Sequence, residues 1–386
     1  MNVYLKKNEE KRILQGSSFI YANEVLKYDK GIKNGSLVDV YSFENKFVGR
    51  GYINHLSKVL VRVFLNEFEE DNKELLKDRI KKADDYRKSL GYKSAYRMVY
   101  SEADALPGLI IDKYEDILVI EISSLGFDMR KDTIVESLVE LFNPKGIYER
   151  CEENLRTKEG LKSIDQVLYG VVPDSIIINE NGIKMSVHVK EGQKTGYFLD
   201  QKENRMAIRR YSKDKRVLDC FSNSGGFSMN AATVAKEVTA VDISDTAINN
   251  VIENAKLNGF NIVKTITGDV FKVLRDFKKN NERFDVIILD PPAFTKSVSE
   301  VNDALRGYKD INILGMKLVN KGGYLISSSC SHYVTRNLFE NMLIESAKEA
   351  HVNARCIEVK SQAPDHPSLL SSGETEYLKF YVIQIN

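Results

Sequence analysis

One stretch of the sequence reads Val217-Leu-Asp-Cys-Phe-Ser-Asn-Ser-Gly-Gly-Phe227. Its first residues form a short, mainly apolar strand, and the residues after Cys220 form a loop that ends in two glycines. Ligands of open α/β sheets bind outside the carboxyl ends of the strands, and glycine allows the backbone to approach a ligand closely. The stretch therefore predicts a strand, a ligand-binding loop and the start of a helix.

The surrounding residues alternate between strand-like and helix-like patterns. Strands are predicted at 216–220, 237–242, 263–267, 284–290 and 323–329, and helices at 225–235, 245–257, 270–279, 301–319 and 335–350. Two further strands are expected near 354–360 and 376–385, and a hairpin near 175–189. Such alternation is typical of a parallel sheet covered on both faces. We expect a doubly wound, mostly parallel, seven-stranded α/β sheet within residues 166–386.

The second of these strands ends in an acidic residue, and another acidic residue follows the third. Asp242 lies about 17 residues past the glycines, close to the spacing of a ribose-binding carboxylate. Asp269 could accept from an adenine amino group. The loop is neither the GxGxxG that seats a pyrophosphate at a helix N-terminus nor a Walker A loop. The pattern favours S-adenosylmethionine, with a doubly wound domain for another ligand as the alternative. The predicted cofactor-binding residues here are Asp219, Phe221, Asn223, Gly225, Gly226, Asp242, Ile243, Asp269, Val270 and Asp290.

The fourth strand runs into Asp290-Pro-Pro-Ala-Phe294. Prolines have a fixed φ and no N–H donor, so this turn is stiff and its carbonyl groups can accept from a base. In amino-group methyltransferases the aromatic residue follows the second proline directly, whereas Ala293 intervenes here. That difference argues against an adenine-amine substrate. We expect Pro291, Pro292 and Phe294 to contact the substrate.

Cys330 lies just past the end of the fifth strand, next to the strand that carries Asp290. We therefore expect both side chains to face one cleft. Carbon 5 of cytosine becomes nucleophilic only after a thiolate adds to carbon 6, which calls for a cysteine nucleophile. An acid is also needed near ring nitrogen 3. Cys330 and Asp290 are the predicted catalytic residues.

A free cysteine is more often a small buried hydrophobe than a nucleophile. Cys220 and Cys356 fit that reading because they fall within predicted strands, and Cys151 has no evident chemical role. His332 could take part in proton transfer, although a lone histidine is more often structural. The position of Cys330 at a strand end is what favours a chemical role there.

The N-terminal half has a different pattern. Residues 1–66 contain short β-like runs separated by turns, and Lys58–Phe64 alternates as a half-buried strand should. We expect a small β-barrel there. Residues 67–90 are charged and helix-favouring, which predicts a linker helix, and residues 91–165 predict a small central α/β module.

Composition excludes several classes of protein. The net charge of the 386 residues is +1, so the chain as a whole is not a strongly basic nucleic-acid binder. Residues 1–65, however, hold eleven Lys and Arg against six Asp and Glu, which is consistent with an RNA-contacting module or with a solvated basic face. The four cysteines and five histidines show no zinc-binding spacing. We expect no metal, no membrane span and a cytoplasmic protein.

Taken together, these motifs resemble the RlmI-type bacterial rRNA large-subunit cytosine carbon-5 methyltransferases, over essentially the whole chain. The stretches that carry the resemblance are Ile13–Val25, Gly49–Asn54, Ala105–Asp112, Glu149–Arg156, Glu191–Arg205, Asp290–Phe294 and Ser329–Ser331. The resemblance implies an N-terminal PUA domain that contacts RNA and a Rossmann-like class I methyltransferase domain. It also implies that the segment before Arg216 closes over the cofactor. That makes Tyr197 and Phe198 candidates for the cofactor, Lys194 and Arg205 for the substrate, and Thr195 a further candidate.

The sequence thus predicts an enzyme that uses S-adenosylmethionine to form 5-methylcytosine in RNA, most simply large-subunit rRNA, through Cys330. The alternatives are methylation of guanine N7 or of uracil carbon 5, because a related guanine-N7 family shares the motif after strand four. A non-catalytic RNA-binding assembly factor is the third reading. A homodimer is also expected to be feasible.

Overall fold

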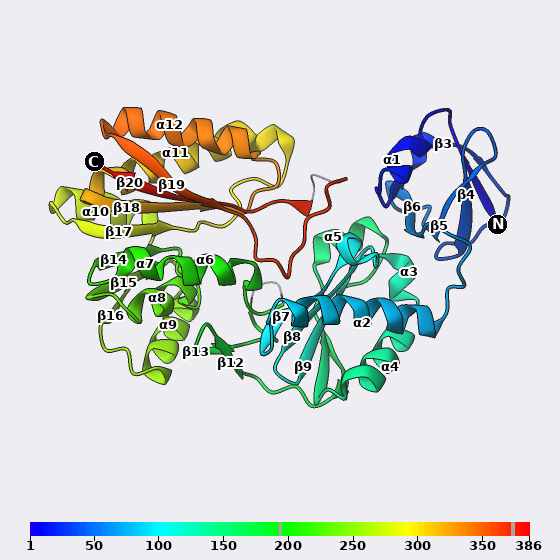
Figure 1. Ribbon diagram of the computed structural model, residues 1–386, viewed down its shortest axis with the longest axis horizontal. Coiled ribbons are helices and arrows are strands. Elements are labelled where there is room, and N and C mark those ends of the chain that lie inside the picture. Colours follow the sequence, from blue (N-terminus) through cyan, green and yellow to red (C-terminus); the bar gives the residue numbers. More distant parts are fainter. Residues whose placement is uncertain (193–194, 372–374) are drawn as a thin grey trace. The chain divides into compact units, whose positions relative to one another are not determined.

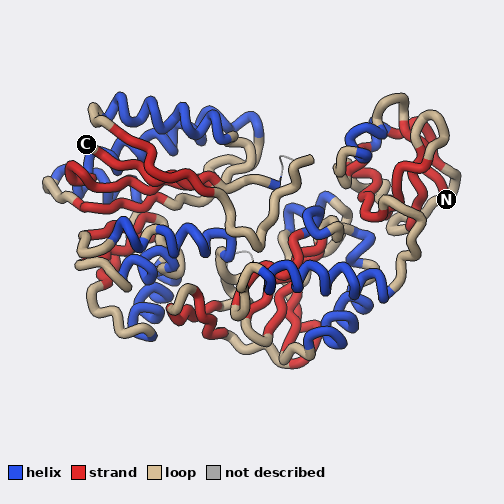
Figure 2. The backbone as a smooth tube through the Cα atoms, in the orientation of Figure 1, coloured by secondary structure: helices blue, strands red, loops and turns tan. Residues whose placement is uncertain are grey.

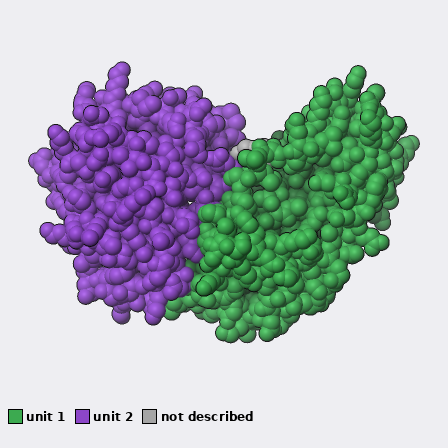
Figure 3. Space-filling view, in the orientation of Figure 1, with its two compact units in different colours: residues 1–178, 187–199, 364–375 green, residues 179–186, 200–363, 376–386 purple. Residues whose placement is uncertain are grey.

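The computed structural model describes residues 1–192, 195–371 and 375–386. The chain forms two compact units, which Figure 3 colours separately. Unit 1 comprises residues 1–178, 187–199 and 364–375, and unit 2 comprises residues 179–186, 200–363 and 376–386. Each unit has its own hydrophobic core.

Unit 1 begins with a six-stranded sheet in the order β2-β6-β5-β4-β1-β3 (Figure 1). Its strands are β1 (Asn2–Leu5), β2 (Phe19–Tyr21), β3 (Val25–Tyr28), β4 (Leu37–Tyr41), β5 (Phe47–Ile53) and β6 (Val59–Leu65), with the short helix α1 (Glu10–Leu14). Alternate residues of β4 are buried, as a sheet with one solvated face requires. Val38, Val40 and Val61 are among the apolar side chains that fill this core.

The rest of unit 1 is a five-stranded sheet in the order β11-β10-β9-β8-β7. It is built from β7 (Ala95–Tyr100), β8 (Leu109–Tyr114), β9 (Ile117–Ile122), β10 (Gly146–Glu149) and β11 (Gln166–Gly170), with α2 (Lys73–Ser89), α3 (Leu125–Asp128), α4 (Lys131–Phe142) and α5 (Glu153–Lys158). Buried Glu159 joins this module to the β-barrel, because its carboxylate accepts from Ser57 at 2.6 Å and from Arg62 at 2.8 Å.

Helix α2 is more than the expected linker. It begins at an N-cap, Asn72, whose side chain accepts from the backbone N–H of Leu75. Its apolar face carries Leu76 and Ile80, which belong to the same buried cluster as Ile134 of α4. The helix is therefore an integral part of the central module, because its i, i+4 apolar spacing is buried against that module's sheet.

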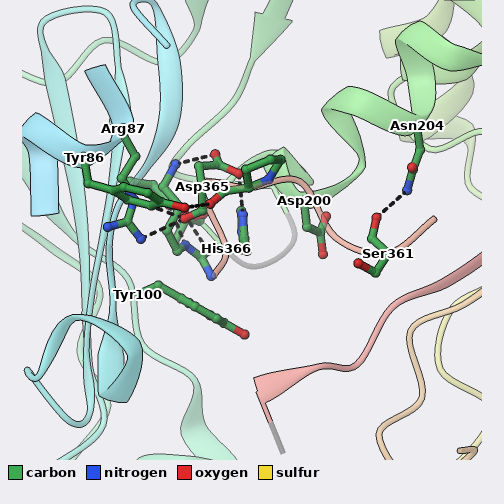
Figure 4. A network of polar contacts seen from close by, with 12 residues as sticks. Tyr86, Arg87, Tyr100, Asp200, Asn204, Ser361, Asp365 and His366 are labelled. Carbon is green, nitrogen blue, oxygen red and sulfur yellow. Dashed lines mark hydrogen bonds and ion pairs between the residues drawn. The ribbon is translucent and has the colours of Figure 1, made fainter. Parts of the chain in front are cut away.

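Some residues of the domain predicted at 166–386 also belong to unit 1. Strand β11 pairs with β10, so residues 166–170 extend the central sheet. Residues 364–375 join unit 1 as well, where the Arg87 guanidinium donates to the carbonyl oxygen of Asp365 at 2.9 Å and Asp365 lies 2.8 Å from His366 Nδ1 (Figure 4). The contact between Arg87 and Asp365 joins residues 278 positions apart in the sequence, so local periodicity could not reveal it.

The hairpin expected near 175–189 is present as β12 (Ile176–Glu180) and β13 (Ile183–Val187). Asn181 and Gly182 form its turn with φ values of 55° and 82°. Positive φ at both central residues is what a two-residue hairpin turn of this kind requires, and Asn-Gly provides it at low cost.

Unit 2 contains the seven-stranded sheet, in the order β16-β15-β14-β17-β18-β20-β19. Its strands are β14 (Arg216–Cys220), β15 (Glu237–Asp242), β16 (Val263–Thr267), β17 (Phe284–Leu289), β18 (Val319–Ser329), β19 (Ala354–Lys360) and β20 (Lys379–Ile385). All neighbours are parallel except β20, which is antiparallel to both β18 and β19. The mostly parallel, doubly wound sheet is confirmed.

Helices cover both faces of this sheet (Figure 2). One buried cluster holds side chains of α10 (Val270–Lys279), α11 (Val301–Leu318) and α12 (Arg336–Ala350). The other holds side chains of α7 (Arg209–Ser212) and α8 (Gly226–Ala232), and α9 (Asp245–Leu257) contacts β15 and β16. The strand order reverses between β14 and β17, and ligands of such sheets bind at that point, outside the carboxyl ends of the strands.

Candidate active site

The loop after β14 has an unusual backbone. Phe221, Asn223 and Gly225 all have positive φ, at 62°, 47° and 83°, and two of them are not glycine. Residues other than glycine rarely adopt this conformation, and such strain clusters at binding sites. Gly225 also serves as the N-cap of α8, which places Gly226 in the first turn of that helix. The loop is thus held in one defined shape at the sheet's carboxyl edge.

Asp219 lies beneath this loop as the fourth residue of β14 and is fully buried. One carboxylate oxygen accepts from Ser228 Oγ at 2.6 Å. The other has no hydrogen-bond partner among the described residues. Burial raises the pKa of Asp219 to about 7, against the opposing effect of the Ser228 hydrogen bond. A buried acceptor without a partner is costly, so this oxygen is suited to a donor from a bound ligand.

Asp242 ends β15 and is oriented by the backbone. Its carboxylate accepts from the N–H of Asn223 at 2.9 Å and from the N–H of Ser244 at 3.0 Å. The adjacent Ile243 side chain is 70% exposed, which is a large apolar surface beside a fixed carboxylate. The oriented carboxylate of Asp242 is suited to ribose hydroxyls, and the apolar surface of Ile243 is suited to the face of an aromatic base.

Asp269 and Val270 lie after β16, at the start of α10. The Asp269 side chain is exposed and accepts from the N–H of Lys272 at 2.9 Å, so it caps the helix. Val270 is buried in the core. Capping explains why an acid stands there without any ligand, and a contact of Asp269 with adenine stays a prediction.

Asp290 follows β17 and is held from two sides. Ser328 Oγ of β18 and Gln201 Nε2 both donate to its Oδ1, the latter at 2.9 Å. Asn204 of α6 (Lys202–Ala207) supports Gln201, because its Nδ2 donates to Gln201 Oε1 at 2.7 Å and to the Ser361 carbonyl at 3.1 Å (Figure 4). Burial raises the pKa of Asp290 to about 6, and the negative charge of Asp200 acts in the same direction.

Gln201 and Ser328 were not among the site residues predicted from the sequence. Ser328 belongs to the run Ser327-Ser-Ser329, and all three serines are buried in β18. A run of hydroxyl residues in a strand of otherwise apolar neighbours was the available signal, since buried polar groups need partners.

Cys330 is half-buried and comes directly after β18. The strand pairs in register with β17, with Ser327 opposite Leu289, so the chain reaches Cys330 beyond the level of Asp290. Tyr308 of α11 holds the residues on both sides, because its hydroxyl contacts Ser329 Oγ at 3.0 Å and Ser331 Oγ at 3.1 Å. The predicted catalytic pair therefore occupies the ends of adjacent strands in unit 2.

The segment Pro291–Phe294 is held in the fold by its aromatic residue. Pro291 is buried and Pro292 is exposed. The Phe294 ring packs 4.5 Å from the Tyr308 ring and 6.2 Å from the Phe271 ring, measured between centroids. Phe294 thus anchors the turn to α11 and α10, and its contact with a substrate base stays a prediction.

Arg205 also has a structural partner. It is buried, and its guanidinium forms a two-point ion pair with Glu180 at 2.6 and 2.7 Å. Its positive charge nevertheless lowers the pKa of Asp290. Tyr197 and Phe198 belong to unit 1, and their role toward the cofactor stays a prediction. Lys194 lies outside the described residues.

The other cysteines divide into two kinds. Cys220 is fully buried in the core, and burial raises the pKa of its thiol, so it is inert as expected. Cys356, expected to be buried, is exposed, because β19 forms the edge of the sheet. The Cys151 thiol donates to the carbonyl of Ile164 at 3.5 Å.

No group of metal-ligating side chains is found among the described residues. Within the same residues, no helix is long and apolar enough to cross a membrane.

Comparisons with known proteins agree with this architecture. The family model for S-adenosylmethionine-dependent methyltransferases matches residues 158–380, and the model for PUA-like domains matches residues 3–66. The chain is therefore an S-adenosylmethionine-dependent methyltransferase with an N-terminal PUA-like domain. Within that class it belongs to the ribosomal RNA large subunit methyltransferase I family.

Two relatives show how complete the match is. Ribosomal RNA large subunit methyltransferase I from Aeromonas salmonicida is 38% identical over 390 residues, covering 99% of this chain and 98% of the relative. The protein of the same name from Vibrio cholerae is 38% identical over 392 residues, covering 99% of both chains.

Solved structures share the fold over the same length. A protein from Streptococcus mutans, provisionally described as a SAM-dependent methyltransferase, aligns with a TM-score of 0.84 at 22% identity over 99% of both chains. Another, provisionally described as a methyltransferase and complexed with SAH, aligns with a TM-score of 0.86 at 22% identity over 99% of both chains.

Proposed function

We propose that this protein transfers the methyl group of S-adenosylmethionine to carbon 5 of a cytosine in large-subunit rRNA. The names of its full-length relatives support rRNA as the substrate, and the PUA-like domain supports contact with RNA. Such a substrate places the enzyme in the cytoplasm. Association into a homodimer stays a prediction.

The residues of unit 2 fit the cofactor. The unpartnered oxygen of Asp219 is suited to the ammonium of the methionine moiety, since charge-assisted bonds are the strong ones. The Asp242 carboxylate, already oriented by two backbone N–H groups, is suited to the ribose hydroxyls. Exposed Ile243 offers an apolar surface to the adenine. When bound, S-adenosylmethionine supplies an electrophilic methyl group.

The chain's own chemistry centres on Cys330 and Asp290. The Cys330 thiolate adds to carbon 6 of cytosine, the C5=C6 double bond opens, and electron density moves to carbon 5. Asp290 donates a proton to ring nitrogen 3, which accepts the remaining charge. Burial supports that role, since it raises the pKa of Asp290 to about 6 and so favours the protonated carboxyl. After methylation, a base removes the carbon-5 proton, the C6–S bond breaks to restore the thiolate, and ring nitrogen 3 returns its proton to the Asp290 carboxylate.

One observation carries the proposal. Cys330 follows the strand whose Ser328 hydroxyl donates to Asp290, so nucleophile and acid are supported by the same strand end. A guanine-N7 methyltransferase needs no thiol, because N7 has its own lone pair. Uracil carbon 5 would need the same thiol chemistry and is the closer alternative.

The test compares Cys330→Ala with the wild-type protein on large-subunit rRNA. We expect wild type to form 5-methylcytosine, detected by nucleoside mass spectrometry, and Cys330→Ala to lose at least about 1,000-fold in rate, as loss of a nucleophile does. Cys356→Ala, which removes an exposed thiol at the sheet edge, is the matched control and should retain wild-type activity.

Other products separate the alternatives. Formation of 7-methylguanine or 5-methyluracil by the wild-type protein would overturn the cytosine assignment. RNA binding without any methyl transfer would instead support an assembly factor. Full activity of Cys330→Ala would overturn the role of the thiol.

A further inference from the structure

Lys379 is a buried lysine that the sequence analysis did not single out. It begins β20 and lies opposite Ser329 of β18, one residue before Cys330. Only 5% of the surface of this residue is exposed. Lysine is almost never buried to this extent unless its charge is paired.

The ammonium is held by the backbone around Cys330. Lys379 Nζ donates to the carbonyl of Ser331 at 2.6 Å and to the carbonyl of Tyr377 at 2.7 Å. Both acceptors are neutral, and an ammonium has three protons. The first contact places the positive charge against the residue that immediately follows the proposed nucleophile.

Other charged and titratable groups lie around this lysine. Glu376 and Arg336 of α12 act on it with opposite signs, and they form an ion pair with each other at 2.5 Å. Tyr308 of α11 is neutral at ordinary pH, since burial raises its pKa to about 12. The His332 ring lies 5.2 Å from the Tyr377 ring.

The thiol of Cys330 also acts on the charge of Lys379. Burial lowers the pKa of Lys379 to about 8, and the negative charge of the Cys330 thiolate opposes that shift. Lys379 is thus mainly protonated at neutral pH. Because the attraction between two opposite charges is mutual, the Lys379 ammonium acts on the Cys330 thiolate as strongly as the thiolate acts on it.

We propose that Lys379 is a positioning residue that keeps a positive charge beside Cys330 and thereby favours the thiolate form of that cysteine. An adjacent cation favours a thiolate because it stabilises the charged form without taking part in the reaction. The use of that thiolate on cytosine rests on the proposed function, but the charge interaction itself does not.

The experiment measures alkylation of Cys330 by iodoacetamide as a function of pH, without RNA, and follows the Cys330 peptide by mass spectrometry. We expect Lys379→Met to lower the rate at pH 7 about tenfold and to move the midpoint up by about one pH unit, the two being equivalent for a single thiol. Lys379→Arg keeps the charge and should stay within about twofold of wild type.

The matched control is Lys321→Met. Lys321 is an exposed residue of β18 itself, in the part of the strand before the stretch that leads to Cys330. This variant loses the same net charge and should leave the alkylation profile unchanged. An unchanged profile in folded Lys379→Met, or an equal loss in folded Lys379→Arg, would overturn the proposal.

The wild-type protein tests the idea even if Lys379→Met fails to fold. The proposal requires the alkylation midpoint of Cys330 to lie below that of an ordinary thiol, about 8.5, and a midpoint at or above that value would overturn it. The outcome is separable from the proposed function. If Cys330→Ala is inactive while the alkylation profile of Cys330 in Lys379→Met is unshifted, the nucleophile assignment stands and only the role of Lys379 is removed.

Discussion

At the scale of single residues, the proposed cofactor site contains carboxylates in different environments. Asp242 receives two backbone N–H groups, whereas Asp219 is buried with one oxygen unpartnered among the described residues. Both were identifiable from the sequence as acids at the carboxyl ends of strands. Their different surroundings were not, because burial and hydrogen bonding depend on residues far away in the chain.

Asp219 leads to a prediction about pH. Its pKa of about 7 in the free protein means that the carboxyl is mainly protonated below pH 7, and a protonated carboxyl pairs poorly with a ligand ammonium. We expect the affinity for S-adenosylhomocysteine to fall by up to about tenfold per pH unit below pH 7. Isothermal titration calorimetry from pH 5.5 to 8.5 measures this, and Asp219→Asn should bind more weakly with no such dependence. A wild-type affinity that is constant over this range would contradict the role of Asp219.

Cys356 shows where residue-level prediction failed, and Phe294 shows a packing that the local sequence did not indicate. Phe294 was placed correctly next to the diproline turn, but its ring packs on Tyr308. Cys356 was placed correctly in a strand, but that strand is at the edge of the sheet. Which way a ring turns and which strand lies outermost are properties of tertiary packing, and the local pattern does not contain them.

At the scale of elements, sequence periodicity was most informative in unit 2. The expected strands 216–220, 237–242 and 263–267 match β14, β15 and β16, because their apolar runs are bounded by charged or turn residues. Strand β18 begins four residues earlier than expected, at Val319. The register with β17 shifts between the pairs Phe284–Val319 and Val286–Tyr324, so this early part of the strand is irregular.

The loop between β14 and α8 leads to a second prediction. Gly225 has φ +83°, and an added Cβ would lie 3.2 Å from a Val251 methyl group. Gly225→Ala should therefore destabilise the protein by about 1–2 kcal/mol and weaken binding of S-adenosylhomocysteine, which thermal unfolding and calorimetry measure.

Gly259→Ala is the matched control for this prediction. Gly259 has φ +69°, but its Cβ would meet nothing within 4 Å. It should show a similar loss of stability with unchanged ligand affinity. Equal ligand affinity in Gly225→Ala and the wild type would contradict a role for the loop in binding.

At the scale of the whole molecule, the chain was expected to fold as successive domains, and the structure shows a more interleaved arrangement. Residues 187–199 and 364–375 belong to unit 1 although they flank or interrupt segments of unit 2. Composition and motif spacing located the β-barrel and the seven-stranded sheet. They could not show these excursions, because long-range contacts such as that between Arg97 N–H and Asp365, 2.9 Å apart, leave no local signal.

The central claim is that the Cys330 thiolate forms a covalent bond to carbon 6 of cytosine. The most direct measurement uses rRNA that contains 5-fluorocytidine, where fluorine replaces the proton that must leave carbon 5. We predict a protein–RNA complex that survives denaturing electrophoresis, depends on S-adenosylmethionine, maps to the Cys330 peptide and is absent with Cys330→Ala. Methylation of rRNA with no trapped complex, or a complex that persists in Cys330→Ala, would contradict the account.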